Sequence, residues 1–324
     1  MPRHLPEFDI VGVGLNATDT MILVPRLPAW GGKAPFTREI VSVGGQVATA
    51  MVACVALGLR AKYIGTLGSD ERGRIQLESL RASDINIDHI QVRENCPNQS
   101  AYIVIDGETG ERTVLWERPD CLRISAAEIR EEQIACARML HIDGHDTAAV
   151  EHAARIARMH GIPVSCDVDT IYPGFDRVLP LVDYLVTSAE FPARWTGLPD
   201  PLDALRALRD RHHMRVAAMT LGAEGALALT EDGFVYSPGF RVPAVDTTGA
   251  GDVFHGAFCY AVLQQMPLGE ALEFSNAMAA LNTLALGARG GIRGLADVRQ
   301  QMASADRKSR PDFEKLPRSG TAQL

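Results

Sequence analysis

An aspartate follows a run of small residues in the stretch DTTGAGDVFHGAF, Asp246 to Phe258. The apolar residues after Asp252 fall at helical spacing and a proline lies beyond them, so a helix is expected to begin at this turn. The first N–H groups of a helix have no partner within it, and the helix dipole adds roughly half a positive charge there. Because the side chains of Gly249, Ala250 and Gly251 are small, a ligand can reach those groups. The turn is therefore predicted to bind an anion.

The carboxylate at this turn has a different predicted task. Asp252 would repel an anion, so it is expected to take a proton from a hydroxyl that attacks the anion. Phosphoryl transfer needs this arrangement, because it depends mostly on positioning and on charge neutralisation. The alternative is an aspartate that only caps the helix, which is worth about 1 kcal/mol.

Composition limits the class of protein. The chain has 324 residues, a formal net charge of −8 and 46% hydrophobic residues, with acidic and basic residues interspersed. No basic tract appears, so nucleic acid is not an expected partner. No apolar run approaches the roughly 18 residues of a membrane span, and the first ten residues lack a signal-peptide core. The six cysteines form no Cys-x-x-Cys pair. We expect a cytoplasmic protein in a reducing compartment, with neither a disulfide framework nor a zinc site.

Strand-like and helix-like segments alternate along most of the chain. Helices are expected over 44–58, 70–84, 126–137, 148–160 and 201–212, with strands over 61–68, 138–143, 162–169, 183–188 and 216–222. This alternation predicts a parallel, doubly wound sheet. Residues 99–119 have the pattern of a β-hairpin. We expect one α/β domain over 1–300, with a discontinuous β lid from about 19–43 and 91–118. The polar tail over 301–324 is expected to be flexible.

The stretch DTTGAGDVFHGAF resembles the C-terminal signature of the ribokinase-like (PfkB-type) carbohydrate kinases. GGQVATAMVACVALG at 44–58, TLGAEG at 220–225 and GARGG at 287–291 resemble further parts of that family in the same order. The resemblance covers about residues 8–300. It implies a doubly wound, mostly parallel sheet flanked by helices, with a small β lid. It also implies an ATP-dependent kinase that phosphorylates a hydroxyl, typically a primary one, on a small sugar.

The resemblance assigns roles to individual residues. Asp252 would be the catalytic base, and the amides of Gly249, Ala250 and Gly251 would form the anion hole. Substrate contacts are implied or predicted at the strand ends and the lid hinge, at Asn16, Asp19, Gly44, Gly45, Gln46, Thr49 and Asp143. Nucleotide contacts are implied at Thr220, Gly222, Gly225, Asn276 and Gly290.

The same resemblance implies binding sites for metal ions. Glu190 would organise Mg²⁺ through water, although Thr187 stands where the family has an asparagine. Asp246 and Thr248 lie where many members hold a monovalent cation such as K⁺. Thr49 also replaces an asparagine of the N-terminal signature.

Other patterns have competing interpretations. GVGLNA at 12–17 fits the dinucleotide pattern, but a β-rich run with prolines follows it in place of the required helix. His141 and His145 flank Asp143 and could bind a metal, yet polar neighbours in a cleft are the favoured interpretation. Lys33 is either a solvated loop residue or a contact for an anionic substrate group.

The acceptor stays open at this point. Asp19, Asp143, Asp167 and Asp169 are expected near the cleft, and several carboxylates favour a neutral polyol, although each could instead be a helix cap or turn former. A sugar is therefore the first hypothesis and a nucleoside the second. The chain is also similar to sulfofructose kinases, with Lys33 as the candidate for the sulfonate. A sugar-binding relative without catalysis is the remaining alternative. A homodimer through the β lid is expected, since many relatives of this type dimerise in that way.

Overall fold

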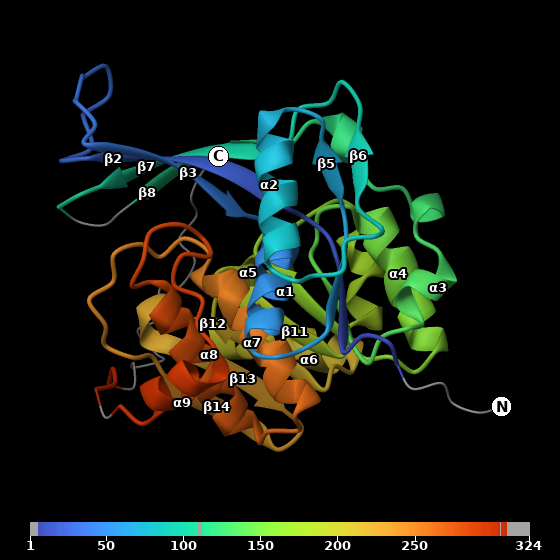
Figure 1. The fold of residues 1–324 in the computed structure, drawn as a ribbon. Coiled ribbons are helices and arrows are strands. Elements are labelled where there is room, and N and C mark those ends of the chain that lie inside the picture. The colour runs from blue at the N-terminus through green and yellow to red at the C-terminus, as the bar shows by residue number, and fades with distance from the viewer. Residues whose placement is uncertain (1–5, 109–111, 305, 310–324) are drawn as a thin grey trace.

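An eight-stranded sheet forms the centre of the molecule in the computed structural model, which describes residues 6–108, 112–304 and 306–309 (Figure 1). Its order is β14-β13-β12-β11-β10-β9-β1-β4. The parallel strands are β4 (Ala61–Ile64), β1 (Ile10–Val13), β9 (Leu140–Ile142), β10 (Val164–Val168), β11 (Tyr184–Ser188) and β12 (Val216–Thr220). The antiparallel strands are β13 (Gly225–Thr230) and β14 (Gly233–Pro238). The predicted mostly parallel sheet is confirmed.

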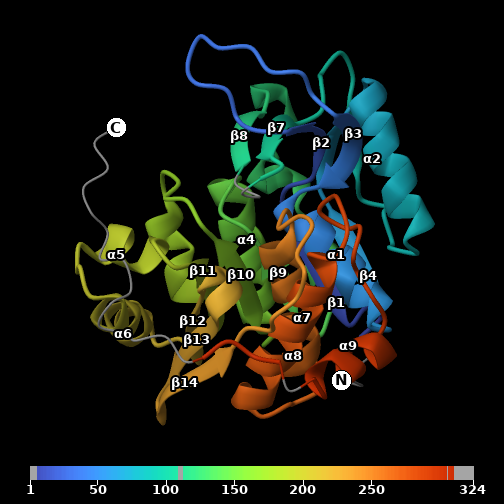
Figure 2. The same ribbon diagram turned by 90° about the vertical axis from the view of Figure 1, so that its left-hand side faces the viewer.

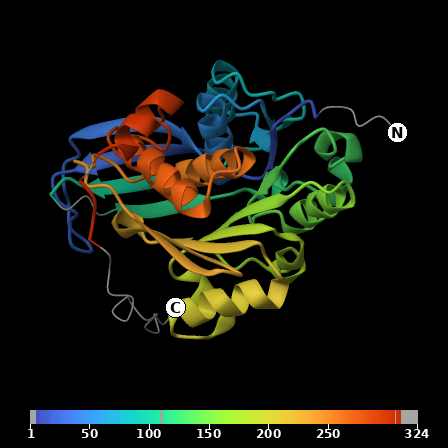
Figure 3. The same cartoon turned by 90° about the horizontal axis from the view of Figure 1, so that it is seen from below.

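Helices cover both faces of this sheet, as Figure 3 shows from below. One face packs against α1 (Gln46–Ala56), α7 (Ala250–Leu263), α8 (Leu268–Asn282) and α9 (Leu295–Met302). The other face packs against α4 (Thr147–Met159), α5 (Phe191–Thr196) and α6 (Pro201–His212). Parallel strands buried in this way need apolar side chains on both faces, which explains their nearly continuous apolar sequences. Within the described residues, no helix is long and apolar enough to cross a membrane.

Helix α7, which carries the predicted base, is held close to α1. A side chain at Gly256 would place its Cβ 2.4 Å from the carbonyl oxygen of Ala50, so this crossing requires a glycine. Phe254 and Phe258 on α7 are nearly fully buried and stack with their ring planes 7° apart. Close packing of this kind leaves little freedom for the helix to shift. The N-terminus of α7 is therefore fixed relative to the sheet.

A separate four-stranded sheet lies over one side of the body (Figures 1 and 2). Its order is β3-β2-β7-β8, with β3 at Arg38–Gly44, β2 at Ala17–Val24, β7 at Ser100–Asp106 and β8 at Arg112–Glu117. It has a small apolar core of its own around Met21, Ile103 and Ile105, and we refer to it as the lid. Strand β2 follows β1 after three residues, so no helix follows GVGLNA, as expected for a chain without a dinucleotide turn.

Two sequence expectations were wrong in detail. The strand expected over 61–68 divides at Gly65 into β4 and β5 (Thr66–Gly68), which pairs with β6 (Gln91–Arg93) beside α2 (Glu71–Ala82). The helix expected over 126–137 is reduced to a 3₁₀ turn at Ala126–Glu128 and one helical turn, α3 (Glu131–Ile134). The side chain of Glu128 turns back to accept hydrogen bonds from Ser125, and the chain then extends at the buried Ile129. Local capping and burial thus outweigh helix propensity.

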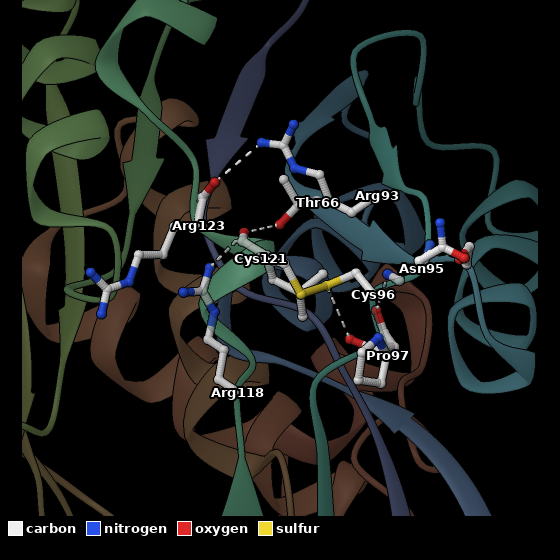
Figure 4. Close-up of a disulfide and its surroundings, with 12 residues drawn as sticks. Thr66, Arg93, Asn95, Cys96, Pro97, Arg118, Cys121 and Arg123 are labelled. Carbon is white, nitrogen blue, oxygen red and sulfur yellow. Dashed lines mark hydrogen bonds between the residues drawn. A yellow bond between two sulfur atoms is a disulfide. The ribbon is translucent and has the colours of Figure 1, made fainter.

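A disulfide joins Cys96 to Cys121 and corrects the expectation that the cysteines are unpaired (Figure 4). Cys96 precedes β7 and Cys121 follows β8, so the bond closes the base of the lid hairpin. Their Cα atoms are 6.1 Å apart although 25 positions separate them in sequence. No local sequence motif indicates this disulfide. The two cysteines come together because β7 and β8 pair in the folded lid. Cys54, Cys136, Cys166 and Cys259 are free thiols.

The chain after α9 returns to the body. Arg307 forms an isolated antiparallel bridge with Phe240, and its guanidinium lies 3.8 Å from the centre of that ring. Arg307 also pairs with Glu273 on α8 at 2.5 Å. These contacts hold the first residues of the segment that was expected to be flexible. Residues 310–324, the larger part of that expectation, lie outside the described residues.

Candidate active site

The turn before α7 is built by backbone constraints. Gly249 has φ of 72°, and a Cβ there would lie 2.3 Å from the carbonyl oxygen of Ala288. Asp246 accepts hydrogen bonds from the N–H groups of Thr248 at 2.9 Å and Gly287 at 2.8 Å. By contrast, a Cβ at Gly251 would meet nothing within 4 Å. The turn is therefore locked on one side and open on the other, where its N–H groups could meet a ligand.

A buried asparagine that the sequence analysis missed supports this turn. The amide of Asn282 at the end of α8 donates to the carbonyl of Ala288 at 3.0 Å and accepts from the N–H of Gly291 at 3.2 Å. It also donates to the carbonyl of Thr248 at 3.3 Å. Asn282 thus joins the turn before α7 to the GARGG segment. Nothing in its local sequence distinguishes it from other helix residues.

Asp252 lies in the first turn of α7 and is half-buried. Burial, together with the neighbouring carboxylates of Asp167 and Asp169, raises the pKa of Asp252 to about 7, while His255 and Arg289 oppose that rise. A carboxylate with a raised pKa is a stronger base than an ordinary aspartate, and it can take a proton from a hydroxyl near neutral pH. Burial and neighbouring carboxylates thus favour a role for Asp252 as a base.

A cavity of about 600 Å³ lies against the open side of the turn. Ala250 and Gly251 line it, and so do four of the residues predicted to contact the nucleotide, namely Thr220, Gly222, Gly225 and Asn276. The amide of Asn276 donates to the carbonyl of Ser237 at 3.0 Å, which fixes one wall. Gly290 is placed elsewhere, against the carbonyl of Leu286. The structure therefore brings together the catalytic turn and most of the predicted nucleotide residues.

Three cationic side chains also line this cavity, and the sequence analysis missed them. Arg112 reaches it from the lid strand β8, where its guanidinium donates to the hydroxyl of Thr247. Arg241 follows β14, and Lys308 belongs to the segment held by Arg307. Cations that converge on an anion-binding turn favour phosphate groups. Each comes from a different region of the chain, so no spacing pattern could reveal them.

The lid side of the cleft presents polar atoms that lack partners. Asp19 is 7% exposed, and its Oδ1 has no hydrogen-bond partner among the described residues. Burial raises the pKa of Asp19 to about 6. The Oε1 atom of Gln99 is likewise buried without a partner in the described structure. Buried polar atoms rarely stay unpaired, so these oxygens are candidates for hydroxyl groups of a substrate.

Asn16 and the lid hinge at Gly44–Gln46 are held by local contacts. The amide of Asn16 donates to the hydroxyl of Tyr63 at 3.0 Å and to the carbonyl of Thr66 at 2.7 Å. Gly45 has φ of 94°, and a Cβ there would lie 2.2 Å from the Cα of Asn16. Gly44 and Gln46 flank Gly45, at the end of β3 and the start of α1 respectively.

Arg289 crosses the space between the lid hinge and the catalytic turn. It donates to the carbonyl of Gly44 at 2.8 Å and to the hydroxyl of Thr49 at 3.2 Å. Its charge lowers the pKa of both Asp19 and Asp252, while burial lowers the pKa of Arg289 itself to about 10. Thr49, which replaces a family asparagine, therefore positions this cation. The sequence analysis noted the GARGG segment and overlooked its arginine.

Asp143 is placed differently from the other candidates. Its side chain is fully buried and accepts hydrogen bonds from the N–H groups of Leu15 at 2.7 Å and His145 at 3.0 Å. It therefore ties the end of β9 to the residues after β1, and its contact with a substrate stays a prediction. His145 bonds the hydroxyl of Tyr172 at 2.9 Å. Within the described residues, no group of three His, Cys, Asp or Glu side chains is arranged to hold a metal ion.

The residues expected near metal ions have mixed surroundings. Glu190 is exposed at the start of α5, where it could reach a water bound to Mg²⁺. Thr187 is buried, and its hydroxyl donates to the carbonyl of Ala218 at 3.3 Å. The hydroxyl oxygen of Thr248 is buried and has no partner within the described residues, which suits an oxygen ligand to a cation. Lys33 is exposed in the loop between β2 and β3.

Comparison with known proteins identifies the family of this chain. The family model described as "pfkB family carbohydrate kinase" matches residues 36–293. The chain is 30% identical over 289 residues to an ATP-dependent ribose-1-phosphate kinase of Halopiger xanaduensis, covering 86% of this chain and 93% of that protein. It is 28% identical over 285 residues to a ribokinase of Haemophilus influenzae, covering 86% and 92%. The structure of a putative ribokinase from Agrobacterium tumefaciens matches with a TM-score of 0.84 at 27% identity, covering 91% and 97%.

Proposed function

This chain belongs to the pfkB family of carbohydrate kinases and is an ATP-dependent carbohydrate kinase, and from that premise we propose that it phosphorylates a primary hydroxyl of a small sugar with Asp252 as general base. One observation carries the proposal. A carboxylate with a raised pKa directly follows Gly251, whose backbone faces open space at the edge of a cavity of about 600 Å³. A base next to an anion hole is the arrangement that phosphoryl transfer requires.

The nucleotide would occupy the cavity, with its terminal phosphoryl group at the catalytic turn. The N–H groups of Gly249, Ala250 and Gly251 would then stabilise the charge on the transferred group, and Arg112 would approach from the lid. Asp252 would take the proton from the acceptor hydroxyl while the oxygen of that hydroxyl attacks the terminal phosphoryl group. Closure of the lid would exclude water from the reacting atoms and so limit hydrolysis.

Metal ions would assist through residues already placed. Glu190 would hold Mg²⁺ through water, and Asp246 with Thr248 would hold a monovalent cation such as K⁺. When bound, these cations supply positive charge that neutralises the phosphates. The unpaired hydroxyl oxygen of Thr248 supports the second assignment.

The acceptor would lie between Asp19 and Asp252. The unpaired oxygens of Asp19 and Gln99 would accept hydrogen bonds from its hydroxyl groups. The relatives support a small sugar derivative, because their names specify ribose-1-phosphate kinase, ribokinase and 5-dehydro-2-deoxygluconokinase activities. The indole of Trp116 on β8 is 61% exposed and lies edge-on to His145, two residues after Asp143, and an exposed aromatic ring there favours a nucleoside as the second candidate.

A panel of acceptors tests this proposal. ADP release should be measured with ATP, Mg²⁺ and K⁺ against ribose, ribose 1-phosphate, fructose, 5-dehydro-2-deoxygluconate, 6-deoxy-6-sulfofructose and adenosine. We expect turnover with at least one sugar and a much lower kcat/KM with adenosine. A preference for adenosine would establish the nucleoside alternative. Binding of a sugar by calorimetry without ADP formation on any acceptor would instead indicate a relative that has lost catalysis.

We also propose that two copies of the chain pair through the outer face of the lid. Cross-strand pairing places Val41, Tyr102 and Leu115 on that face, and their side chains are 51%, 48% and 62% exposed. An exposed apolar sheet face of this kind is typical of an interface between subunits. Light scattering after size exclusion should give a dimer for the wild type and a monomer for Leu115→Glu. A wild-type monomer at micromolar concentration would overturn the proposal.

A further inference from the structure

A buried pair of ionisable side chains links α7, which carries the proposed base, to β10 of the sheet. The Nε2 atom of His255 on α7 is 3.1 Å from Oδ1 of Asp167 on β10, and their side chains are 4% and 7% exposed. His255 follows Asp252 by three residues, so both project from the same face of the helix, one turn apart. The pair therefore belongs to the layer between α7 and the sheet that supports the base.

Three further polar groups near this pair carry no charge near neutral pH, namely His141, Ser165 and Cys259. His141 on β9 lies with its ring 5.9 Å from that of His255, and burial lowers the pKa of His141 to about 3. Its Nδ1 bonds the hydroxyl of Ser165 at 3.3 Å, and the thiol of Cys259 lies 3.4 Å from the same hydroxyl. Helix α1 contributes Cys54, whose thiol has a pKa raised well above its usual range by burial. These groups supply no positive charge near neutral pH.

The pKa of Asp252 is set by burial and by four charged neighbours. Asp167 and Asp169 from β10 and its end are negative neighbours, and each raises the pKa of Asp252. Arg289 and His255 are the opposing neighbours. Arg289 is already committed to the carbonyl of Gly44 and the hydroxyl of Thr49. His255 is the group in direct contact with the negative neighbour Asp167.

A purely structural role explains this pair poorly. A buried pair of a histidine and a carboxylate brings little net stability, and apolar residues of similar volume would pack this layer as well. In addition, the Nδ1 atom of His255 is buried and has no hydrogen-bond partner among the described residues. A histidine retained only for packing would be expected to satisfy both ring nitrogens.

We propose that His255 is a positioning residue for catalysis, which holds Asp167 through its Nε2–H and thereby keeps the adjacent base, Asp252, in the ionised form that accepts a proton. The inference rests on the proposed function of Asp252. Without His255, the uncompensated charge of Asp167 would favour protonation of Asp252, since two close carboxylates do not ionise independently. Without the charge of Asp167, Asp252 would ionise more readily.

The test measures the ionisation of Asp252 directly, so it does not need a known acceptor. Protein labelled with ¹³C at the aspartate carboxyl carbons is titrated by NMR, and the resonance absent from Asp252→Asn identifies Asp252. In His255→Leu the midpoint should rise by about one pH unit, and in Asp167→Asn it should fall by a similar amount. His255→Gln, which keeps a donor near the position of Nε2, should shift the midpoint less than His255→Leu.

A double variant guards against a simple folding defect. His255→Leu with Asp167→Asn removes the histidine and the charge that it holds, so the midpoint of Asp252 should return close to the wild-type value. If His255→Leu does not fold, opposite shifts in His255→Gln and Asp167→Asn still support the proposal. An unchanged midpoint in every folded variant overturns it.

The rate profile connects this ionisation to catalysis. With the best acceptor from the panel, the acidic limb of kcat/KM against pH should move with the NMR midpoint in each variant. A loss of activity by the same factor at every pH would show a merely structural role and overturn the proposal. If no acceptor is phosphorylated, the proposed function fails, and the NMR titration still decides whether His255 controls Asp252.

Discussion

The turn before α7 and the lid face the same cleft but are built in different ways. The turn consists of backbone groups held by Gly249, by the carboxylate of Asp246 and by the amide of Asn282. The lid presents exposed side chains, including Trp116 at 61% and Val114 at 44%. Backbone geometry tolerates few sequences, whereas exposed side chains can vary without loss of the fold. In the proposed function, the chemistry would therefore be fixed in one short stretch, and the choice of acceptor would be distributed over the lid.

Asp252→Asn gives the largest effect expected on the turn side of this comparison. Removing one positioned base should lower kcat by about 10²- to 10⁴-fold, while the isosteric amide leaves the turn intact. Stopped assays of ADP release measure the rate, and calorimetry with ATP provides the folding and binding control. Turnover near the wild-type level would falsify the assignment of Asp252 as base.

Two glycines of the same turn form a matched pair. Gly249→Ala forces a side chain onto φ of 72° and to within 2.3 Å of the carbonyl of Ala288, so unfolding should become easier by about 1–3 kcal/mol. Gly251→Ala adds a methyl group where nothing lies within 4 Å, so stability should change by less than about 0.5 kcal/mol.

Urea denaturation measures both stabilities, and the KM for ATP separates the two positions further. Since Gly251 lines the cavity, its added methyl group should raise the KM for ATP. Equal losses of stability in the two variants would contradict the view that the turn is locked on one side and open on the other.

The pH profile tests the electrostatics of the turn. Because burial and neighbouring carboxylates raise the pKa of Asp252 to about 7, the base is protonated at lower pH. The value of kcat/KM should therefore fall about tenfold for each pH unit below that pKa and level off above it. Rates at saturating ATP from pH 5 to 9 provide the measurement. A profile that stays level down to pH 5 would show that Asp252 has an ordinary carboxyl pKa.

Trp116→Ala gives the smallest expected effect and probes the lid. The indole is 61% exposed, so stability should change by less than about 0.5 kcal/mol. The KM for the acceptor should rise several-fold, while the KM for ATP stays close to that of the wild type. Leu115→Ala, on the outer face of the lid, is the matched control and should leave both KM values unchanged. A larger effect on ATP than on the acceptor would contradict this division of roles.

The sequence alone predicts sites formed by one short segment better than sites formed by distant parts of the chain. The turn before α7 and the residues Thr220, Gly222 and Gly225 could be located from the sequence, because each lies in one short segment. Gly222, Gly225 and Gly249 adopt positive φ values, which favour glycine. Arg112 and Lys308 reach the cavity from opposite parts of the chain, which only the tertiary fold brings together.

The prediction of the fold from the sequence succeeded and failed for similar reasons. The central sheet was predictable from alternating apolar segments, since each segment carries its own periodicity. The helix expected over 126–137 failed because a local hydrogen bond between Ser125 and Glu128 opposed a helical pattern. Asp143 appeared suited to a substrate from its place after β9, yet two backbone N–H groups occupy its oxygens. Sequence position identifies which residues approach a cleft and leaves their hydrogen-bond partners undetermined.

The disulfide between Cys96 and Cys121 also changes the topology of the chain. The covalent link encloses the whole of the hairpin formed by β7 and β8. A protease that cuts one peptide bond within this hairpin would leave the two fragments covalently joined. On a gel the cleaved protein would run as one band until the bond is reduced, and as two afterwards. The lid can therefore lose the continuity of its backbone while its two halves stay attached to the body.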